Sequence, residues 1–323
     1  MKFYSQFITI KSTGSALPKN RVRNIDLIKS LDTNDEWIKS NLGIHERRIS
    51  SLPDESVIEL GTRAAEIAIE NAKINLSEIG GIIVATSTPE LKAPSTACLI
   101  QNRLKIRNNG FAFDVQAVCS GFIYALTIGA NLIHSGSVDN IVIIGVDVFS
   151  QITDWEDRSC VFFGDGAGAI VLSRDNNGRS VFSAVIHADG SGHEGFYVDK
   201  KSKYFTMNPK MVYEAAIKVL PPTIMEALEI AQIPLDQVKY IVPHQPSLRV
   251  LDETARLLNI EPDRVLKNMR DHANTAGATV PLLLDQTVKG HKLSDGDNIV
   301  MAAVGSGWTW GAVAYKWRTF ENS

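Results

Sequence analysis

The sequence predicts an α/β protein built from two related halves. Continuous apolar, β-branched runs alternate with helical patterns along most of the chain, which is typical of a mostly parallel sheet with helices on both faces. A stretch that begins at Ala72 recurs from Ala231 with its hydrophobic positions in register. The chain has 323 residues, 44% of them hydrophobic and 21% charged, so it can bury a substantial core.

The predicted elements follow in order along the first half. The opening segment, MKFYSQFITIKSTG, alternates in polarity like a strand and lacks the sustained apolar core of a signal peptide. Buried strands are then predicted over 80–88, 110–118, 140–150 and 166–173, and helices over 61–72, 95–106 and about 120–135.

The repeat carries the prediction into the second half. Each copy consists of an amphipathic helix, 61–72 or 221–231, followed by a turn and a strand. The apolar positions that coincide are Ala72 with Ala231, Ile74 with Ile233, Leu76 with Leu235, Ile79 with Val238 and Ile82 with Ile241. A period of this length does not fit a solenoid, and it suits a duplicated α/β lobe.

The two halves are predicted to span residues 1–173 and 174–323, because the polar, turn-rich segment SRDNNGRS starts at residue 173. Residues 298–308 also resemble residues 140–150, although less closely, and this similarity predicts a further strand. Residues 187–210 are the least regular part of the second half, and we interpret them as a surface loop or lid beside a site.

Charge and cysteine content restrict the classes of function. A formal net charge of −3 argues against a general nucleic-acid or anionic-membrane partner. The three cysteines are far apart and include no C-x-x-C pair, so we expect a reducing compartment and neither a disulfide framework nor a structural zinc site. No apolar run has the length needed to span a bilayer, and we expect a cytoplasmic protein.

Cys119 is the first candidate for chemistry. It stands in DVQAVCSGF, after a predicted strand and at the start of a predicted helix. The positive end of a helix dipole and its unpaired amides favour a thiolate, so a lowered thiol pKa is expected here. The alternative is a small apolar side chain that fills core space. Cys98, within a helical pattern, and Cys160, at the start of a β-run, are interpreted as packing residues.

His244 and Asn274 are candidates in the second half. His244 lies in IVPHQPS, where the repeated strand ends between two prolines, and strand ends are where α/β sheets build their sites. Asn274 lies in HANTAGATVP, among small residues that permit a close approach by a ligand. An asparagine there can donate a hydrogen bond to a developing oxyanion. The alternative for each is an ordinary loop side chain without a role.

Two glycine-rich segments need a separate interpretation. FFGDGAGAIVL (162–172) lacks the Lys-Ser/Thr ending of a nucleotide loop and precedes a strand, so we interpret it as close backbone packing. VGSGWTWGAVAY (304–315) also precedes a strand, and its main-chain amides could face an anionic intermediate.

Together these segments resemble one family. The chain resembles the β-ketoacyl-acyl carrier protein synthase III family of the thiolase superfamily over nearly its full length. The matching stretches, in the family's order, are TNDEWI (33–38), GIHERRI (43–49), DVQAVCSGF (114–122), FGDGAGA (163–169), VPHQPSLR (242–249), HANTAGATVP (272–281) and GSGWTWGA (305–312). The resemblance implies a duplicated, five-layered αβαβα fold of the thiolase type, and a homodimer.

The resemblance also implies roles for the site residues. Cys119 would accept an acyl group from a thioester, while His244 and Asn274 would hold the carbonyl oxygen of a malonyl thioester as it loses carbon dioxide. The enolate would then attack the acyl-cysteine to give a 3-oxoacyl product. Main-chain amides of Cys119 and Ser306 would form the oxyanion hole. Coenzyme A or phosphopantetheine thioesters are the implied substrates and acyl carrier protein the implied partner, without a metal or redox cofactor.

Two other functions stay open from the sequence. A non-condensing acyltransferase would use the same acyl-cysteine to form an ester, an amide or another product. A non-catalytic partner subunit is the third possibility, although such a subunit usually loses a residue of the trio, and Cys119, His244 and Asn274 are all present. The pathway would be fatty-acid or specialised-metabolite biosynthesis.

Several positions bear on recognition of the thioester carrier in the family that the chain resembles. Trp37 and Arg158 match the pair that brackets the adenine of coenzyme A. Asn41 stands where an arginine commonly assists that headgroup, and Lys210 and Ser247 replace asparagines along the pantetheine channel. These departures predict altered recognition of the carrier.

Ala93 and two arginines concern the acyl group and the protein partner. Ala93, in LKAPSTACLI, replaces a bulky residue that closes the acyl pocket from the partner subunit in short-primer enzymes, which leaves room for a larger acyl group. Arg249 and Arg256 match basic positions that meet the acidic helix of a carrier protein, whereas Glu214 occupies another position that is often basic. The alternative for both arginines is solvated surface charge.

Overall fold

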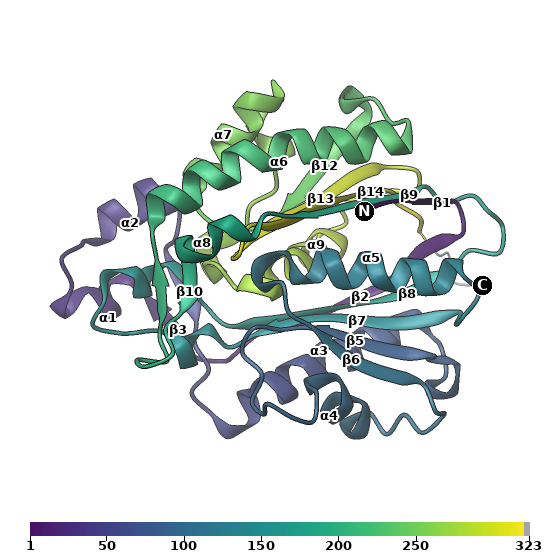
Figure 1. Cartoon of the computed structure of the whole chain (residues 1–323), viewed down its shortest axis with the longest axis horizontal. Helices are drawn as coiled ribbons and strands as arrows, with labels where there is room; N and C mark the ends of the chain where they lie inside the picture. The colour runs from purple at the N-terminus through teal and green to yellow at the C-terminus, as the bar shows by residue number, and fades with distance from the viewer. Residues whose placement is uncertain (320–323) are drawn as a thin grey trace.

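The computed structural model describes residues 1–319 and contains two five-stranded sheets. The first sheet has the strand order β2 (Ile8–Ala16), β8 (Gly166–Arg174), β7 (Asn140–Asp147), β5 (Gly81–Ala85) and β6 (Phe111–Val115). The second has the order β1 (Lys2–Ser5), β9 (Phe182–Ala188), β14 (Thr309–Lys316), β13 (Asn298–Gly305) and β12 (Val238–Pro243). The two sheets lie one above the other, with helices between them (Figure 1).

Helices complete the five layers, which confirms the expected αβαβα fold (Figure 1). The helices are α5 (Gly121–His134) and α9 (Thr279–Lys289) between the sheets, α3 (Val57–Ala72) and α4 (Thr96–Arg103) outside the first sheet, and α6 (Pro209–Ala231) and α7 (Leu248–Leu258) outside the second. Shorter elements are α1 (Asn24–Leu27), α2 (Asp35–Leu42), α8 (Met269–His272) and the pairs β3 (Arg21–Arg23) with β4 (Glu46–Arg48) and β10 (Phe196–Val198) with β11 (Phe205–Met207). Within residues 1–319, no helix combines the length and the apolar character needed to cross a membrane.

The central layer is mostly apolar because it packs against both sheets, and its buried Asp285 in α9 is paired with Lys289 and accepts a hydrogen bond from the Thr13 hydroxyl at 2.7 Å. In α5, Phe122, Leu126 and Ile133 are fully buried, and α9 adds Val280 and Leu284 to the same core. A largely hydrophobic helix such as α5 is stable only where its apolar surface is covered. The two halves therefore share one core, and each depends on the other to bury it.

The predicted duplication is visible in the structure. α3 and α6 end at Ala72 and Ala231, and the next residues, Lys73 at φ 53° and Gln232 at φ 56°, both adopt the left-handed conformation. Each copy continues through a short 3-10 turn into the equivalent strand, β5 or β12. These strands pair in parallel with β7 and β13, which correspond to the less closely similar pair of segments in the sequence.

The two sheets differ in one of their five strands, which is β6 in the first sheet and β1 in the second. In the first sheet β6 pairs along β5, whereas the equivalent neighbour of β12 is a single bridge between Ile241 and Val265. The second sheet instead gains β1, which pairs antiparallel with β9 from Lys2 to Ser5. The division of the chain at residue 173 stays a prediction, and the first few residues lie in the second sheet rather than the first.

The prediction of mostly parallel sheets is wrong. β6, β5 and β7 are parallel, but β8 and β2 run antiparallel to their neighbours. In the second sheet β12 and β13 are parallel, and the remaining neighbours are antiparallel. The apolar runs reflect burial of both faces of each sheet by helices, and that burial makes antiparallel strands as hydrophobic as parallel ones.

The irregular segment 187–210 is more ordered than a loop. It contains the hairpin of β10 and β11, in which the rings of Phe196 and Phe205 stack with centroids 5.5 Å apart. Both side chains are buried in a cluster with Phe149 and Phe163. The segment is therefore anchored in a small aromatic core that it shares with Phe149 and Phe163, which its sequence pattern did not indicate.

Helix α6 begins at Pro209, well before the predicted start at 221. Asn208 caps the helix, since its side-chain oxygen accepts a hydrogen bond from the Met211 amide at 3.2 Å. Pro209 occupies the first turn, where the missing N–H has no intrahelical partner to lose. Pro221 and Pro222 lie inside the helix, and burial of the surrounding apolar stripe outweighs the hydrogen bonds that they remove.

The glycine-rich segment 162–172 serves close packing, as predicted. A Cβ at Gly168 would lie 2.6 Å from the main-chain nitrogen of Leu282 in α9, and one at Gly164 would lie 2.5 Å from the His272 carbonyl oxygen. β8 can approach α9 this closely because Gly168 has no side chain.

Gly168→Ala is expected to destabilise the fold, because the new methyl group meets main-chain atoms of α9 that cannot move independently. Overpacking of this kind typically lowers the free energy of unfolding by about 1–3 kcal/mol. Gly190→Ala is the matched control, since a Cβ there meets nothing within 4 Å. Thermal unfolding followed by circular dichroism should show a lower midpoint for Gly168→Ala, and equal midpoints would contradict this account of the packing.

Candidate active site

The predicted site residues converge at strand ends from both halves of the chain. Cys119 follows β6, His244 follows β12, and Asn274 forms a bridge with Phe163 just before β8. All three, with Ser306 of the β13–β14 turn, line one pocket of about 80 Å³, called the Cys119 pocket below. The remaining wall is largely aromatic and aliphatic and includes Phe162, Phe163, Phe196, Met207, Val212, Tyr213, Val250, Val304 and Trp308.

Cys119 is presented by a strained turn. Val118 has φ 47°, although β-branched residues avoid this left-handed region. The turn is held by Ser120, whose hydroxyl oxygen lies 2.9 Å from the Ala117 carbonyl oxygen and 2.8 Å from the Thr309 hydroxyl oxygen. Strain of this kind persists only where the surroundings enforce it, and it is common at active sites.

The β13–β14 turn packs directly against the turn that carries Cys119. A Cβ at Gly305 would lie 2.5 Å from the Ala117 carbonyl oxygen and 2.9 Å from the Ser120 amide nitrogen. The glycine is therefore required for the two turns to touch. Ser306 follows it immediately, so the main chain at Ser306 and the thiol of Cys119 belong to the same pocket.

His244 is buried and neutral. The residue is 2% exposed, and its amide donates to the Ala302 carbonyl oxygen at 2.8 Å. Burial lowers the pKa of the imidazole to about 3. Its Nδ1 atom is buried and has no hydrogen-bond partner within the part of the chain that the structure describes. A neutral imidazole keeps one N–H donor and one acceptor, which suits the binding of a substrate oxygen.

Asn274 is held by its own loop. Its main-chain N–H donates to the Phe162 carbonyl oxygen at 3.0 Å, and its side-chain oxygen accepts from the Ala276 amide at 2.8 Å. The second contact fixes the amide orientation, so the NH₂ end is the one available to a ligand. Ala273 and Ala276 flank it at φ 55° and 48°, and this turn is strained like the one before Cys119.

Asp147 is a site residue that the sequence did not single out. It ends β7, is fully buried, and accepts hydrogen bonds from the Ser87 amide at 2.8 Å, the Thr88 hydroxyl at 3.0 Å and the Gly277 amide at 2.8 Å. It thereby ties the loop after β5 to the loop of Asn274. Burial raises the pKa of its carboxyl group. The available signal was one carboxylate at the end of an otherwise apolar run, NIVIIGVDVF.

The prediction of a lowered thiol pKa for Cys119 is wrong. Burial raises the pKa, the Asp147 carboxylate raises it further, and the Cys119 main-chain N–H opposes them only in part. His244 contributes no positive charge, because its imidazole is neutral. Desolvation therefore outweighs the end of the helix, and Cys119 rests as a thiol.

Trp37, Arg158 and Asn41 come together away from the thiol. The Arg158 guanidinium carbon lies 4.3 Å from the centre of the Trp37 ring, so the two side chains stack. The Asn41 side chain donates to the Trp37 carbonyl oxygen at 3.0 Å. Ser247 lines the Cys119 pocket and caps α7, since its hydroxyl accepts from the Val250 amide at 3.4 Å.

Other predicted residues lie outside the pocket. Lys210 and Ala93 are exposed, and neither is among the described residues that line it. Arg249 and Arg256 are exposed on α7, and Arg256 forms a two-point ion pair with Glu253 at 2.7 and 2.8 Å. An exposed pair of this kind contributes little to stability.

The duplicated five-layer fold, with a cysteine, a histidine and an asparagine in one apolar pocket, defines a thiolase-type condensing enzyme. Residues 113–190 match the family described as 3-oxoacyl-[acyl-carrier-protein (ACP)] synthase III, and residues 228–317 match its C-terminal part. The β-ketoacyl-[acyl-carrier-protein] synthase III of Aquifex aeolicus is 40% identical over 309 residues, which cover 95% of this chain and 99% of the relative. The chain belongs to the β-ketoacyl-acyl carrier protein synthase III family.

Further relatives agree over the whole length. The synthase III of Rhizorhabdus wittichii is 42% identical over 313 residues, covering 94% of this chain and 98% of the relative. The crystal structure of the Aquifex aeolicus 3-oxoacyl-[acyl-carrier-protein] synthase III superposes with a TM-score of 0.92, covering 96% of this chain and 100% of that one, at 40% identity. The relatives therefore favour a condensing acyltransferase over the non-condensing alternative.

Cys119 is expected to react faster with iodoacetamide as the pH rises, because only the thiolate reacts and the thiol pKa is raised. The rate should increase about tenfold per pH unit from about pH 6 to about pH 9 without levelling off. Peptide mapping by mass spectrometry measures the rate at Cys119 alone, with Cys119→Ser as the blank. A plateau below about pH 8 would instead reveal a thiolate stabilised in the resting pocket.

Proposed function

We propose that this protein joins an acyl group to a malonyl thioester, with Cys119 as the residue that carries the acyl group. The observation behind the proposal is that Cys119, His244 and Asn274, drawn from both halves, line one small pocket with few other polar side chains. A cysteine suits the task because its sulfur is a good nucleophile when deprotonated and a good leaving group afterwards.

In the first step the acyl group moves from its thioester to Cys119. The sulfur of Cys119 attacks the acyl carbonyl, and the bond from the carbonyl carbon to the carrier's sulfur breaks. The Cys119 proton passes to the departing sulfur, so the carrier leaves as a free thiol. Since the thiol and the His244 imidazole are both neutral at rest, the proton leaves during acyl transfer rather than before substrate binds. Main-chain N–H groups of Cys119 and Ser306 stabilise the oxyanion of the tetrahedral intermediate.

In the second step a malonyl thioester binds to the acyl-enzyme. His244 and Asn274 donate hydrogen bonds to its thioester carbonyl oxygen as the carboxylate leaves as carbon dioxide. The electrons of the broken carbon–carbon bond form an enolate, which attacks the carbonyl carbon of the acyl-cysteine to give a 3-oxoacyl thioester. The Cys119 sulfur leaves as a thiolate and takes up a proton from water to restore the thiol. Two neutral, fixed donors in a buried pocket suit this step because negative charge develops on the oxygen only during the reaction.

The proposed substrates are thioesters of coenzyme A or of the phosphopantetheine arm of an acyl carrier protein, with no metal or redox cofactor. The stacked Trp37 and Arg158 side chains support recognition of a flat heterocycle such as adenine. Of the two arginines on α7, Arg249 is the better candidate for meeting an acidic carrier protein, because Arg256 is already paired with Glu253.

A homodimer and a cytoplasmic location belong to the same proposal. β6 is an edge strand, and its Phe111 and Phe113, stacked with centroids 5.6 Å apart, are only half-buried. Proteins normally cover an apolar edge strand, and a second copy of β6 would do so. The three cysteines are free, which fits a reducing compartment.

His244→Ala and Asn274→Ala are expected to load Cys119 and yet lose condensation. Removal of one oxyanion donor typically lowers the rate on the order of 10²–10³-fold. Intact-protein mass spectrometry with an acyl-coenzyme A measures loading, and carbon dioxide released from malonyl thioester measures the second step. Cys119→Ser should fail at both.

Three outcomes would contradict these roles. Normal condensation by both variants would remove His244 and Asn274 from the second step. An acyl group found on Cys98 or Cys160 would reject Cys119 as the carrier. Acyl transfer to a product without release of carbon dioxide would favour the non-condensing alternative.

Ala93→Phe is expected to shift donor preference from octanoyl- towards acetyl-coenzyme A, because a small residue 93 leaves space that a phenyl ring would fill. Asn41 should also weaken binding of the coenzyme A headgroup, since a missing charge-assisted contact is worth about 1.5–3 kcal/mol, or tenfold or more in affinity. Competition of the two donors for Cys119 measures the preference.

Light scattering on the same samples measures the oligomeric state, which is the control for the role of Ala93. The side chain does not line the pocket of its own chain, so its effect requires a dimer. A monomer in solution, or a preference for acetyl that the substitution does not alter, would reject this role.

A further inference from the structure

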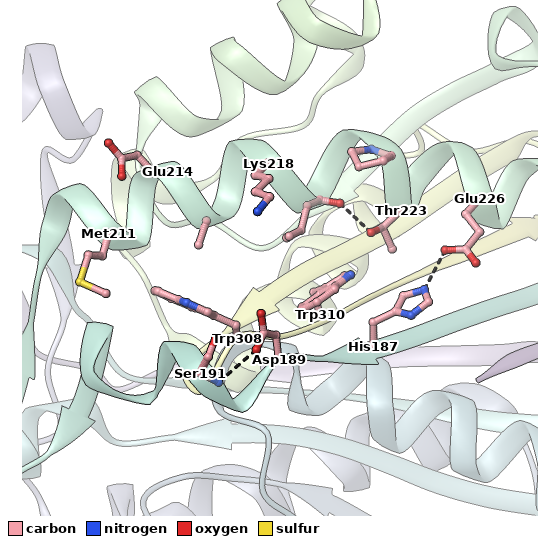
Figure 2. Close-up of a pocket in the computed structure, with 13 residues that line it drawn as sticks. His187, Asp189, Ser191, Met211, Glu214, Lys218, Thr223, Glu226, Trp308 and Trp310 are labelled. Carbon is pink, nitrogen blue, oxygen red and sulfur yellow. Dashed lines mark hydrogen bonds and ion pairs between the residues drawn. The ribbon is translucent and has the colours of Figure 1, made fainter.

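A second cleft lies beside the Cys119 pocket, between one face of α6 and the strands beneath it (Figure 2). This α6 cleft has a volume of about 630 Å³. Met211, Ala215 and Val219 of α6 and Trp310 of β14 form the apolar part of its lining. The charged and polar residues that also line it include Asp189, Ser191, Glu214, Lys218 and Thr223. The ion pair between His187 and Glu226, at 2.7 Å, lies at the end remote from Trp308 in Figure 2.

Trp308 is the one described residue that lines both spaces. On one side it shares the Cys119 pocket with Ser306 and Cys119. On the other it borders the α6 cleft, between Met211 and Trp310 in the view of Figure 2. The indole is therefore a partition between a space of about 80 Å³ and one of about 630 Å³.

Two glycines hold this partition in place. A Cβ at Gly192 would lie 1.6 Å from indole atoms Cδ1 and Nε1, and one at Gly195 would lie 2.6 Å from Cη2 and Cζ2. The indole thus rests along the main chain of this segment, and the Asp189 amide donates to the Trp308 carbonyl oxygen at 2.8 Å. Trp308 has φ 42°, a conformation rare for tryptophan, so its position is enforced by these contacts.

The Cys119 pocket alone has room for a short acyl group. Its volume of about 80 Å³ is smaller than the roughly 150 Å³ of apolar cavity that accommodates benzene. The end of a pantetheine arm must also enter this pocket if Cys119 is to be acylated. A longer chain needs further apolar space, and the apolar part of the α6 cleft, formed by Met211, Val219 and Trp310, suits methylene groups.

We propose that Trp308 limits the length of the acyl chain on the α6 side of the Cys119 pocket, and that the α6 cleft is the binding site for the distal part of a longer linear acyl chain once the indole no longer divides the two spaces. The inference rests on the proposed function, in which Cys119 carries the acyl group. It concerns a different wall from that of Ala93, which does not line the pocket of its own chain.

The test is the loading of Cys119 from acetyl- and dodecanoyl-coenzyme A, followed by intact-protein mass spectrometry. In Trp308→Ala, the ratio of dodecanoyl to acetyl loading is expected to rise about tenfold or more, because several additional methylene groups become buried. Adding Val219→Trp refills the cleft and should return the ratio to that of the unsubstituted chain. Trp310→Ala removes an indole from the cleft but keeps the partition, and should leave the ratio unchanged.

Gly192→Ala is an independent variant, in case loss of the indole prevents folding. Its Cβ collides with the Trp308 ring and displaces the partition without removing it, so the ratio should again rise. If neither Trp308→Ala nor Gly192→Ala raises the ratio of dodecanoyl to acetyl loading, while the unsubstituted chain loads acetyl on Cys119, the inference is overturned.

The remaining outcomes are also decisive. A rise that Val219→Trp does not reverse would place the longer chain outside the α6 cleft and overturn the inference. A rise in Trp310→Ala as large as that in Trp308→Ala would show that Trp308 is not the partition. Failure of the unsubstituted chain to load any donor on Cys119 would reject the proposed function itself, and the inference with it.

Discussion

The helices α5 and α9 lie between the two sheets and bury their apolar side chains against both, with Phe122 and Leu284 fully buried. Neither half of the chain completes its core alone. When the halves pack over this shared layer, the ends of β6 and β12 lie beside the same pocket, which Cys119 and His244 both line. The site is thus a consequence of how the core is covered, since no local motif brings together residues so far apart in the sequence.

The electrostatic character of the pocket follows from the same burial. Desolvation raises the pKa of Cys119 and lowers that of His244 to about 3, so both groups are neutral at rest. Charge enters the pocket only with a substrate or with the reaction. Fixed neutral donors are well suited to a developing anion, because they need not reorganise when it forms. Val118, Ala276 and Trp308 all have positive φ. Such conformations persist only where the surrounding packing enforces them, so the side chains of the pocket are held in fixed positions.

Much of this arrangement could be predicted from the sequence, and the failures have physical reasons. The repeat was visible because Ala72 and Ala231 each end an amphipathic helix before a strand. Strand direction was not predictable, since burial on both faces makes parallel and antiparallel strands equally apolar. The thiol pKa was predicted in the wrong direction because it depends on Asp147 and on cover from the second half, which are contacts between distant segments. Trp308 was likewise unremarkable until the fold placed it against Gly192.

Strand β1 has a consequence for how the chain folds as it is synthesised. The first sheet, from β2 to β8, is fully translated by Arg174, whereas the partner of β1, strand β9, begins at Phe182 and itself pairs with β14 at 309–316. While the ribosome is still adding these later residues, the nascent first lobe can form its hydrogen bonds, but β1 has no neighbour to pair with. An unpaired strand of this kind is a template for aggregation and a target for chaperones. Strand β1 is therefore protected later than the strands of the first sheet, although those strands follow it in the chain.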